Sequence, residues 1–256
     1  MANGDSLSSL FPAPDDLTIR SAEVARVGRG VAWKIISNYE WLGTLPPCTD
    51  YYGVFFDGVC GGVGCWSVGS AGSAMMIAPM LGVTQHELAY LCRGACVHWA
   101  PVGTAPRLIN MSVKLLAAQK PVKVCIAYSD TDAGEIGTVY QASGWICIGL
   151  GISDYEWVTP SGVTRNRSTT RDVANRNGAS WAEATAILEA AGWTRQAKNR
   201  KWRYVKLTPR GMEDSELIGR VQSLKTPYPK RQPVEGGCTP AVERRGRSDP
   251  DAPSSE

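Results

Sequence analysis

The sequence lacks any apolar run long enough to cross a membrane. No stretch approaches the roughly 18 consecutive apolar residues that a transmembrane helix needs. The N-terminus also lacks the basic start and apolar core of a secretory signal peptide, because residues 1–16 are polar and carry Asp5, Asp15 and Asp16. These absences predict a cytosolic protein that has no membrane partner.

Metal-binding motifs are also scarce. The eight cysteines include no C-x2-C pair, and the chain has only two histidines, His86 and His98. A structural zinc site is therefore not expected. A chain of 256 residues that is 43% hydrophobic can bury a core without disulfide bonds, so we interpret the cysteines as buried free thiols.

Charge is unevenly distributed along the chain. The net charge is only +3, but residues 161–230 hold 14 Lys or Arg against 6 Asp or Glu, whereas residues 1–160 hold 9 against 13. This asymmetry indicates a region that faces a polyanion, on a body that is otherwise close to neutral.

Apolar spacing predicts alternating helices and strands. Hydrophobic residues recur every three or four positions in the helices and follow one another or alternate in the strands. We expect helices over 21–38, 107–120, 135–143 and 181–191, and strands over 51–56, 59–68, 88–97, 122–128, 145–150 and 202–207. This order predicts an α/β fold, a mixed sheet flanked by crossover helices, with the active site beyond the carboxyl ends of central strands.

Composition divides the chain into one domain with appendages. We expect disordered termini over 1–18 and 231–256, and a domain over 19–230. Residues 153–200 are polar and basic, and we interpret them as an insertion. Within it we expect a loop that contains Arg165, Arg167, Arg171 and Arg176.

The most informative segment is the one that follows the strand over 122–128. Ser129, Asp130 and Asp132 follow its carboxyl end, and Tyr140 lies on the next helix, from which its phenol can point back to the loop. The residue types alone also fit a capped helix start, with Asp132 as the N-cap and Tyr140 in the core. Nothing like Gly-x-Ser-x-Gly surrounds Ser129, so we rank it as a helper rather than a nucleophile.

This segment resembles the Mom family of phage proteins. The resemblance lies in Tyr128-Ser-Asp and in the continuation Gly-x-x-Gly-Thr-x-Tyr-Gln-Ala over 134–142, and more weakly in Leu91-Cys-Arg93, Arg203-Tyr-Val205 and Tyr228-Pro-Lys230. It covers residues 30–150 and 198–230. Family members have a GNAT-like acyltransferase fold and convert adenine in DNA to a carbamoylmethyl derivative, which shields phage DNA from restriction. The resemblance implies double-stranded DNA as partner and the cytoplasm of an infected bacterial host as location.

By this resemblance Arg93, Asp130 and Tyr140 are the functional residues. Asp130 would act as general base on the adenine amine or hold a metal, and Tyr140 would donate to a leaving group or stack on a flipped base. Arg93 would neutralise an oxyanion or a phosphate, or pair with Asp130 as a structural partner. The three side chains are expected to border one pocket.

Donor and metal sites depart from the family patterns. In place of the GNAT pyrophosphate loop, residues 101–107 contain a single glycine and two prolines, which leaves Gly103, Thr104, Ala105 and Arg107 as the candidate site for an acyl-CoA donor. Where the family has His-Tyr, this chain has Glu40-Trp41. Glu40 and Asp130 are therefore the candidate ligands for a divalent metal such as iron, although a solvated Glu40 fits as well.

A final stretch combines cations with aromatic rings. We interpret Arg195, Lys198, Arg200, Lys201, Arg203, Trp202 and Tyr204 as a nucleic-acid interface, in which cations bind phosphates and rings stack on bases. The alternative is a solvated strand edge.

Two rival functions stay open. One is an N-acetyltransferase acting on a small amine or a protein, and the other is a DNA-binding or inhibitor protein that keeps the fold without catalysis.

Overall fold

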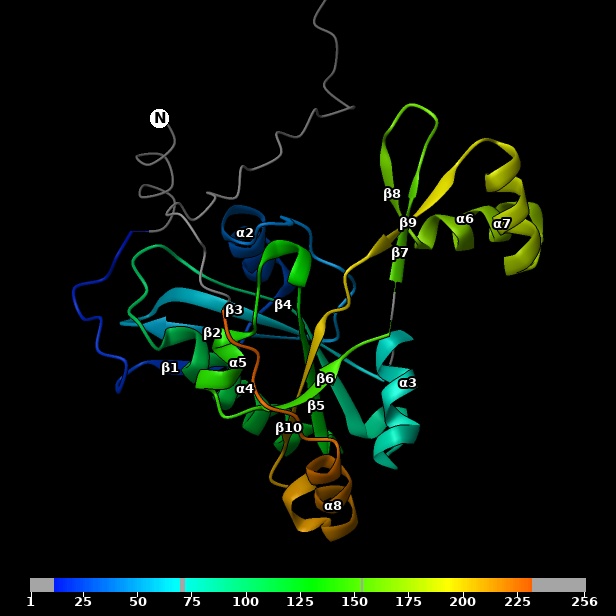
Figure 1. Ribbon diagram of the computed structural model, residues 1–256. Coiled ribbons are helices and arrows are strands. Elements are labelled where there is room, and N and C mark those ends of the chain that lie inside the picture. Colours follow the sequence, from blue (N-terminus) through cyan, green and yellow to red (C-terminus); the bar gives the residue numbers. More distant parts are fainter. Residues whose placement is uncertain (1–11, 70–71, 153, 232–256) are drawn as a thin grey trace, which may run out of the picture.

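The computed structural model describes residues 12–69, 72–152 and 154–231. Its centre is a seven-stranded mixed sheet in the order β1-β2-β3-β4-β5-β10-β6 (Figure 1). The strands are β1 (Glu23–Arg26), β2 (Asp50–Phe56), β3 (Val59–Val68), β4 (Leu88–Cys96), β5 (Val124–Ser129), β6 (Ile146–Leu150) and β10 (Trp202–Leu207). This arrangement confirms the predicted mixed sheet. The predicted strands are present with shifts of one or two residues at their ends.

Helices cover both faces of the sheet because successive strand residues point to opposite sides. On one face Cys125 and Ala127 of β5 pack with α4 (Thr104–Gln119), and α5 (Thr138–Ala142) lies beside it. On the other face Val124 and Ile126 pack with α3 (Gly72–Leu81) and α8 (Ser215–Ser223), and α2 (Arg29–Tyr39) covers β2 and β3. In the described part of the chain, no helix is long and apolar enough to span a membrane.

The central strands β4 and β5 run parallel and then separate. Their register extends only from Leu88–Val124 to Tyr90–Ile126. Beyond Tyr90, β4 continues along β3 as far as Cys96, whereas β5 continues along β10 as far as Ser129. The carboxyl ends of the two strands therefore diverge. Between them there is no backbone pairing, and one loop begins on each side of this gap.

The inserted unit between β6 and β10 has its own small fold. It contains β7 (Asp154–Val158), β8 (Thr164–Asn166), α6 (Ser168–Asn177), α7 (Trp181–Ala190) and β9 (Thr194–Lys198), with its strands in the order β8-β7-β9. Trp157 is fully buried at its centre and donates from Nε1 to Thr170 Oγ1 at 2.8 Å. Figure 1 shows this unit projecting from one end of the main sheet.

Several sequence predictions are wrong at the level of single elements. The helix expected over 21–38 begins only at Arg29, and its first part is strand β1. The arginines expected in a loop lie on β8 and α6 or beside them. The helix expected over 135–143 is reduced to α5. Helices α3 and α8 and the strands of the insertion were not predicted.

The predicted disordered termini fall largely outside the described residues, which begin at 12 and end at 231. Within the expected N-terminal segment, Leu17 packs against the core beside Ile19.

Candidate active site

Asp130 is fixed at the end of β5 by contacts from two directions. Its side chain caps the 3-10 turn Thr131–Ala133 by accepting from the Asp132 N–H at 3.1 Å. The other carboxylate oxygen lies 2.6 Å from Lys201 Nζ. The backbone N–H of Asp130 donates to Glu135 Oε2 at 3.0 Å. Asp130 is therefore the N-cap of this turn, and α5 has Gly137 at its own N-cap, so the alternative that placed Asp132 in that role is wrong.

The loop around Asp130 is also attached to the end of the insertion. Asn199 donates to Asp132 Oδ1 at 2.6 Å, and Thr131 Oγ1 donates to the Arg200 carbonyl at 3.0 Å. Residues 199–201 thus hold the candidate active-site loop by three contacts that include the Lys201–Asp130 ion pair. Lys201, which was predicted to bind phosphate, pairs with the candidate general base.

Tyr140, which belongs to α5, lies in a cluster of aromatic rings. Its ring centroid is 5.5 Å from that of Trp145 and 5.2 Å from that of Tyr204. Burial raises the pKa of the Tyr140 phenol, and the nearby Tyr90, Glu135 and Tyr204 raise it further. The phenol therefore stays protonated at neutral pH, which suits a hydrogen-bond donor.

Gly137 allows α5 to begin against this cluster. Its φ of +70° lies in the left-handed region that favours glycine. A Cβ at this position would lie 2.4 Å from a ring carbon of Tyr204, whose hydroxyl donates to the Ile136 carbonyl at 2.5 Å. A glycine is required here for both its conformation and its small size.

Arg93 pairs with Glu40 rather than with Asp130. Arg93 Nε lies 3.8 Å from Glu40 Oε2 and donates to the Thr44 carbonyl at 3.1 Å, and Nη1 donates to the Cys92 carbonyl. Burial raises the pKa of Glu40, and Arg93 opposes that rise. The structural partner proposed for Arg93 from sequence is thus the wrong carboxylate.

Glu40 and Glu135 each contact one of the three functional candidates. Arg93 contacts Glu40, and the Glu135 carboxylate is close enough to raise the pKa of Glu40. Glu135 accepts the Asp130 N–H and also raises the pKa of Tyr140. Sequence reasoning missed Glu135 because a carboxylate in a short polar loop carries no distinguishing pattern.

Ser129 is closed off from solvent. Only 1% of its surface is exposed, and its hydroxyl finds no hydrogen-bond partner among the described residues. A buried hydroxyl without a hydrogen-bond partner carries a desolvation cost. No base accepts a hydrogen bond from the Ser129 hydroxyl, so nothing activates it as a nucleophile. Its rank as a helper stays a prediction.

The candidate donor loop offers few hydrogen-bond donors. Helix α4 begins at Thr104, directly after Gly103, and Thr104 donates from Oγ1 to the Pro101 carbonyl and from its N–H to the same oxygen. Pro106 has no N–H, so Ala105 supplies the remaining N–H of the first turn. Arg107 turns away to donate to the carbonyls of Ala22 and Arg20.

The candidate metal ligands do not form a metal site. Glu40 accepts from the N–H groups of Leu42 and Gly43, and Asp130 is engaged by Asp132 and Lys201. Among the described residues no group of three or more His, Cys, Asp or Glu side chains is placed to hold an ion. The residues therefore do not fit the divalent metal that the resemblance suggested.

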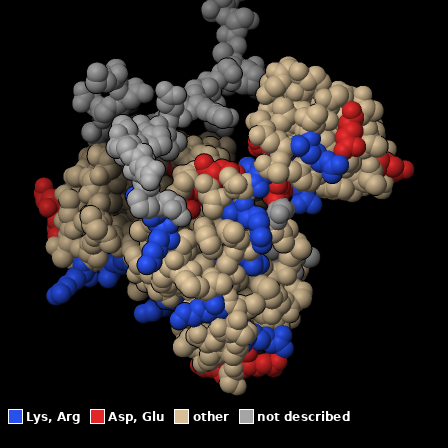
Figure 2. All heavy atoms as spheres, in the orientation of Figure 1, with Lys and Arg blue, Asp and Glu red and all other residues tan. Residues whose placement is uncertain are grey.

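Most side chains of the predicted nucleic-acid stretch have partners within the chain. Tyr204 is 0% exposed in the main core, so its prediction as a base-stacking residue is wrong. Trp202 packs partly against the same core. The cations contact internal partners: Arg195 contacts Glu189, Lys198 contacts Glu156, Arg200 donates to Gly151, and Arg203 donates to Ile148. Figure 2 shows red and blue side chains next to one another where the insertion meets the body.

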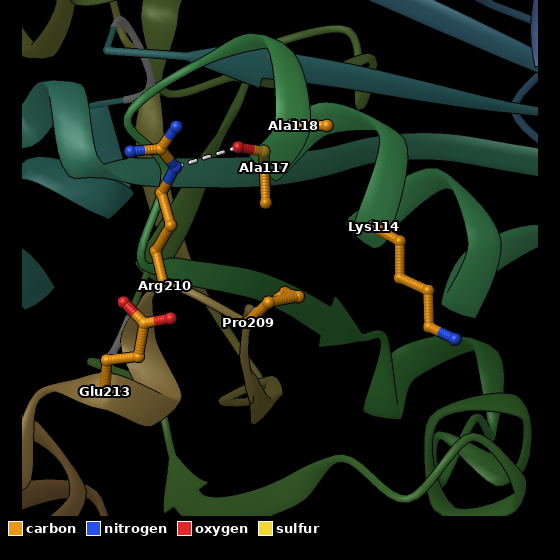
Figure 3. Close-up of a pocket in the computed structure, with 6 residues that line it drawn as sticks. All are labelled: Lys114, Ala117, Ala118, Pro209, Arg210 and Glu213. Atoms are coloured by element: carbon orange, nitrogen blue, oxygen red, sulfur yellow. Dashed lines mark hydrogen bonds between the residues drawn. The ribbon is translucent and has the colours of Figure 1, made fainter.

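A cavity of about 340 Å³ lies away from these residues. It is lined by Lys114, Ala117, Ala118, Pro209, Arg210 and Glu213, between the end of α4 and the turn after β10 (Figure 3). Arg210 Nε donates to the Ala117 carbonyl at 3.0 Å, which ties the two sides of the cavity together. The cavity includes none of the residues that the sequence pointed to.

The sheet and its separating parallel strands define an α/β protein with a mixed sheet flanked by helices. The chain belongs to the Mom protein family, whose family model matches residues 21–230. The resemblance inferred from residues 128–142 is thereby confirmed.

Solved structures with a similar arrangement include acetyltransferases. The IAA acetyltransferase from Bacillus cereus is 9% identical, with a TM-score of 0.41 over 73% of this chain and 99% of that one. The spermidine N-acetyltransferase from Vibrio cholerae, in complex with CoA and spermine, is 9% identical, with a TM-score of 0.40 over 75% and 99%. Scores this low carry no information about substrate or donor. No curated protein matches the chain.

Proposed function

We propose that this protein is a transferase that adds a small acyl-derived group, of the carbamoylmethyl type, to adenine in double-stranded DNA. Its role would be to protect phage DNA from restriction in the cytoplasm of an infected bacterium. The proposal is carried by family membership over residues 21–230, together with the Asp130 carboxylate that the Lys201 ammonium and the Asp132 N–H hold at the end of β5.

Each of the three residues has a role that agrees with its surroundings. The exocyclic amine of adenine is a poor nucleophile, and the Asp130 carboxylate is positioned by Lys201 and by the loop N–H to accept a proton from it. Tyr140, whose raised pKa keeps the phenol protonated, supplies a hydrogen bond to the leaving group. Arg93, held by two backbone carbonyls, presents its remaining N–H groups to an anionic oxygen of the donor.

Access to the amine requires the adenine to leave the duplex, because its N6 is paired there and its reacting face is stacked. The donor is a small molecule carrying the acyl-derived group. For an acyl-CoA, the first turn of α4 offers the Ala105 N–H and little else to a pyrophosphate, so we expect weak binding at that point.

The test is nucleoside mass spectrometry on plasmid DNA from bacteria that express the protein. We expect a heavier deoxyadenosine species and resistance of the plasmid to restriction nucleases. Asp130→Asn should abolish the new species, because an amide cannot accept the amine proton.

Asp214→Asn is the matched control. Asp214 also caps a helix through its side chain and pairs with a lysine, Lys123, at 3.1 Å, but it lies at the start of α8. This variant should lose a similar amount of stability and keep the modification. Folded wild-type protein that binds DNA and leaves it unmodified would overturn the proposal in favour of a non-catalytic binder.

A further inference from the structure

The elements on the β6 side of the main sheet contain cations and no carboxylates. Residues 104–129, 136–152 and 201–212 supply α4, β5, α5, β6 and β10, and the chain returns to β6 after α8. The three ranges hold 8 Lys or Arg and no Asp or Glu, and residues 217–231 add four Lys or Arg, again without Asp or Glu. This side of the molecule therefore carries charge of one sign, although the whole chain has a net charge of only +3.

Carboxylates border these elements in the loop before α5 and at the start of α8. The start of α8 holds Asp214 and Glu216, which pair with Lys123 and Arg220, and Glu213 lies just before it. Between these borders, four cations are exposed and form no salt bridge in the described part of the chain: Lys114, Lys225, Lys230 and Arg231. Figure 2 shows blue side chains on this part of the body and red ones at its α8 end.

The segment 225–231 is fixed along the outer edge of β6. Three hydrogen bonds hold it: the Thr226 N–H donates to the Cys147 carbonyl at 2.8 Å, the Tyr228 hydroxyl to the Trp145 carbonyl at 2.5 Å, and Gln141 Nε2 to the Pro229 carbonyl at 3.4 Å. Lys225 comes directly before these anchored residues, and Lys230 directly after them. Both lysines are therefore placed beside β6 and α5 by an ordered backbone.

Lys206 brings a further cation to the same place. Its Nζ donates to the carbonyls of Ser143 and Gly144, at 2.8 Å and 3.3 Å, and these two residues lie between the anchors Gln141 and Trp145. Burial lowers the pKa of Lys206, and the nearby Lys114 of α4 lowers it further. Cations from α4, from β10 and from the segment 225–231 therefore meet around the end of α5.

An aromatic ring places this surface beside the candidate active site. Tyr228 is 43% exposed, and its ring stacks on Tyr204 with centroids 6.4 Å apart and an interplanar angle of 28°. Tyr204 in turn lies 5.2 Å from the ring of Tyr140. The cations around Tyr228 therefore border the cluster that contains Tyr140.

We infer that the surface formed by Lys114, Lys206 and the segment 225–231 binds the phosphate backbone of duplex DNA. This inference deepens the proposed function and rests on it for the choice of duplex DNA among polyanions. Duplex DNA carries one phosphate charge per about 1.7 Å of helix axis, which a surface with cations and no carboxylates complements. Phosphate contacts fix the orientation of a protein on the duplex, so contacts here would position an adenine near Tyr140.

The first measurement is fluorescence anisotropy with the full-length protein and a labelled DNA duplex. We expect Lys225→Glu and Lys230→Glu each to weaken binding about three- to tenfold at about 0.1 M salt, and each to lower the slope of log K against log salt concentration by about 1. Lys34→Glu is the matched control. It makes the same charge change at an exposed position of α2, which covers β2 and β3 and lies away from this surface in Figure 1, and it should leave binding unchanged.

The second measurement separates charge from structure. Replacing both lysines by arginine keeps the charge and should keep both the affinity and the salt slope, whereas the double change to glutamate should lose affinity by more than either single change. The same anisotropy titration with single-stranded RNA of equal length, and flotation with phosphatidylglycerol vesicles, compare duplex DNA with other anionic partners. We expect the duplex to bind more tightly than the RNA, and the vesicles not to bind.

The outcomes separate this inference from the proposed function. Duplex binding that depends on Lys225 and Lys230, without any modified nucleoside, would support the inference and overturn the proposed activity. Adenine modification and duplex binding that both persist unchanged in the double glutamate variant would overturn the inference alone. So would RNA or vesicles that bind through these lysines as tightly as the duplex does, because the surface would then serve another anionic partner.

Discussion

Replacing Gly137 by alanine tests how tightly the start of α5 is fitted to the aromatic cluster. The substitution has two separate costs. Alanine at a φ of +70° costs roughly 1 kcal/mol relative to glycine, after allowance for the reduced freedom of the unfolded chain. The new methyl group would also lie 2.4 Å and 2.6 Å from two ring carbons of Tyr204.

The second cost is set by how far the Tyr204 ring can move. Tyr204 is fully buried, and its hydroxyl is anchored to the Ile136 carbonyl, so the ring cannot swing aside without losing that bond. Overpacking of this kind costs about 1–3 kcal/mol. The expected total for Gly137→Ala is therefore about 2–4 kcal/mol of unfolding free energy, and Tyr140 should be displaced with it.

Gly134→Ala isolates the backbone cost. Gly134 has nearly the same φ, +69°, and no atom lies within 4 Å of a Cβ built there. Urea unfolding followed by tryptophan fluorescence should show a loss of about 1 kcal/mol for Gly134→Ala and at least twice that for Gly137→Ala. Equal losses in the two variants would refute the claimed contact with Tyr204.

Two further predictions concern the ion pair and the buried phenol. Lys201→Met should cost about 1 kcal/mol of stability but reduce the adenine-modification rate at least tenfold, because the Asp130 carboxylate loses the ammonium group that positions it. Lys123→Met is the control: it also breaks lysine–carboxylate pairs and should leave the rate unchanged. For Tyr204, burial raises the pKa to about 12, so its contribution to stability is complete below pH 10 and is lost as the pH rises towards 12, by up to about 3 kcal/mol. Tyr204→Phe should remove that part of the alkaline loss in urea titrations, and a stability difference from wild type that stays constant between pH 9 and pH 12 would contradict this.

The main sheet was predictable because its strands carry strong local signals. Buried apolar runs mark β2 to β6, and Trp202–Leu207 alternates enough to mark β10. Strand β1 was mistaken for helix because Val24 and Val27 continue the spacing of Val31 and Ile35. Gly28 ends that continuity, and four residues with exposed ends are too short to show an alternating pattern.

The insertion was harder to predict because few of its residues are buried. On α6 only Thr170, Val173 and Ala174 face inward, so the arginines between them dominate the composition and suggest a loop. Its core depends on Trp157, which comes from a strand before the helices. No local pattern indicates that partnership.

In the candidate active site, too, features that depend on neighbouring residues could be predicted, and features that depend on distant residues could not. Asp130 and Tyr140 could be singled out because they lie in one short motif, and the hydrogen bond from the Asp130 N–H to Glu135 is local. The pairing of Asp130 with Lys201 and of Arg93 with Glu40 joins residues far apart in the chain, and the sheet topology decides which charges meet. Sequence reasoning chose Asp130 as the partner of Arg93 because it had no means of ranking such distant pairs.

The position of β10 between β5 and β6 sets an order for folding during synthesis. Strand β6 reaches the rest of the sheet only through β10, and β10 follows the whole insertion in the chain. The inserted unit, whose core is complete once β9 has emerged from the ribosome, is free to fold first. The main sheet can be completed only after residue 207 has been made, so a nascent chain halted before β10 would leave β5 with an open edge.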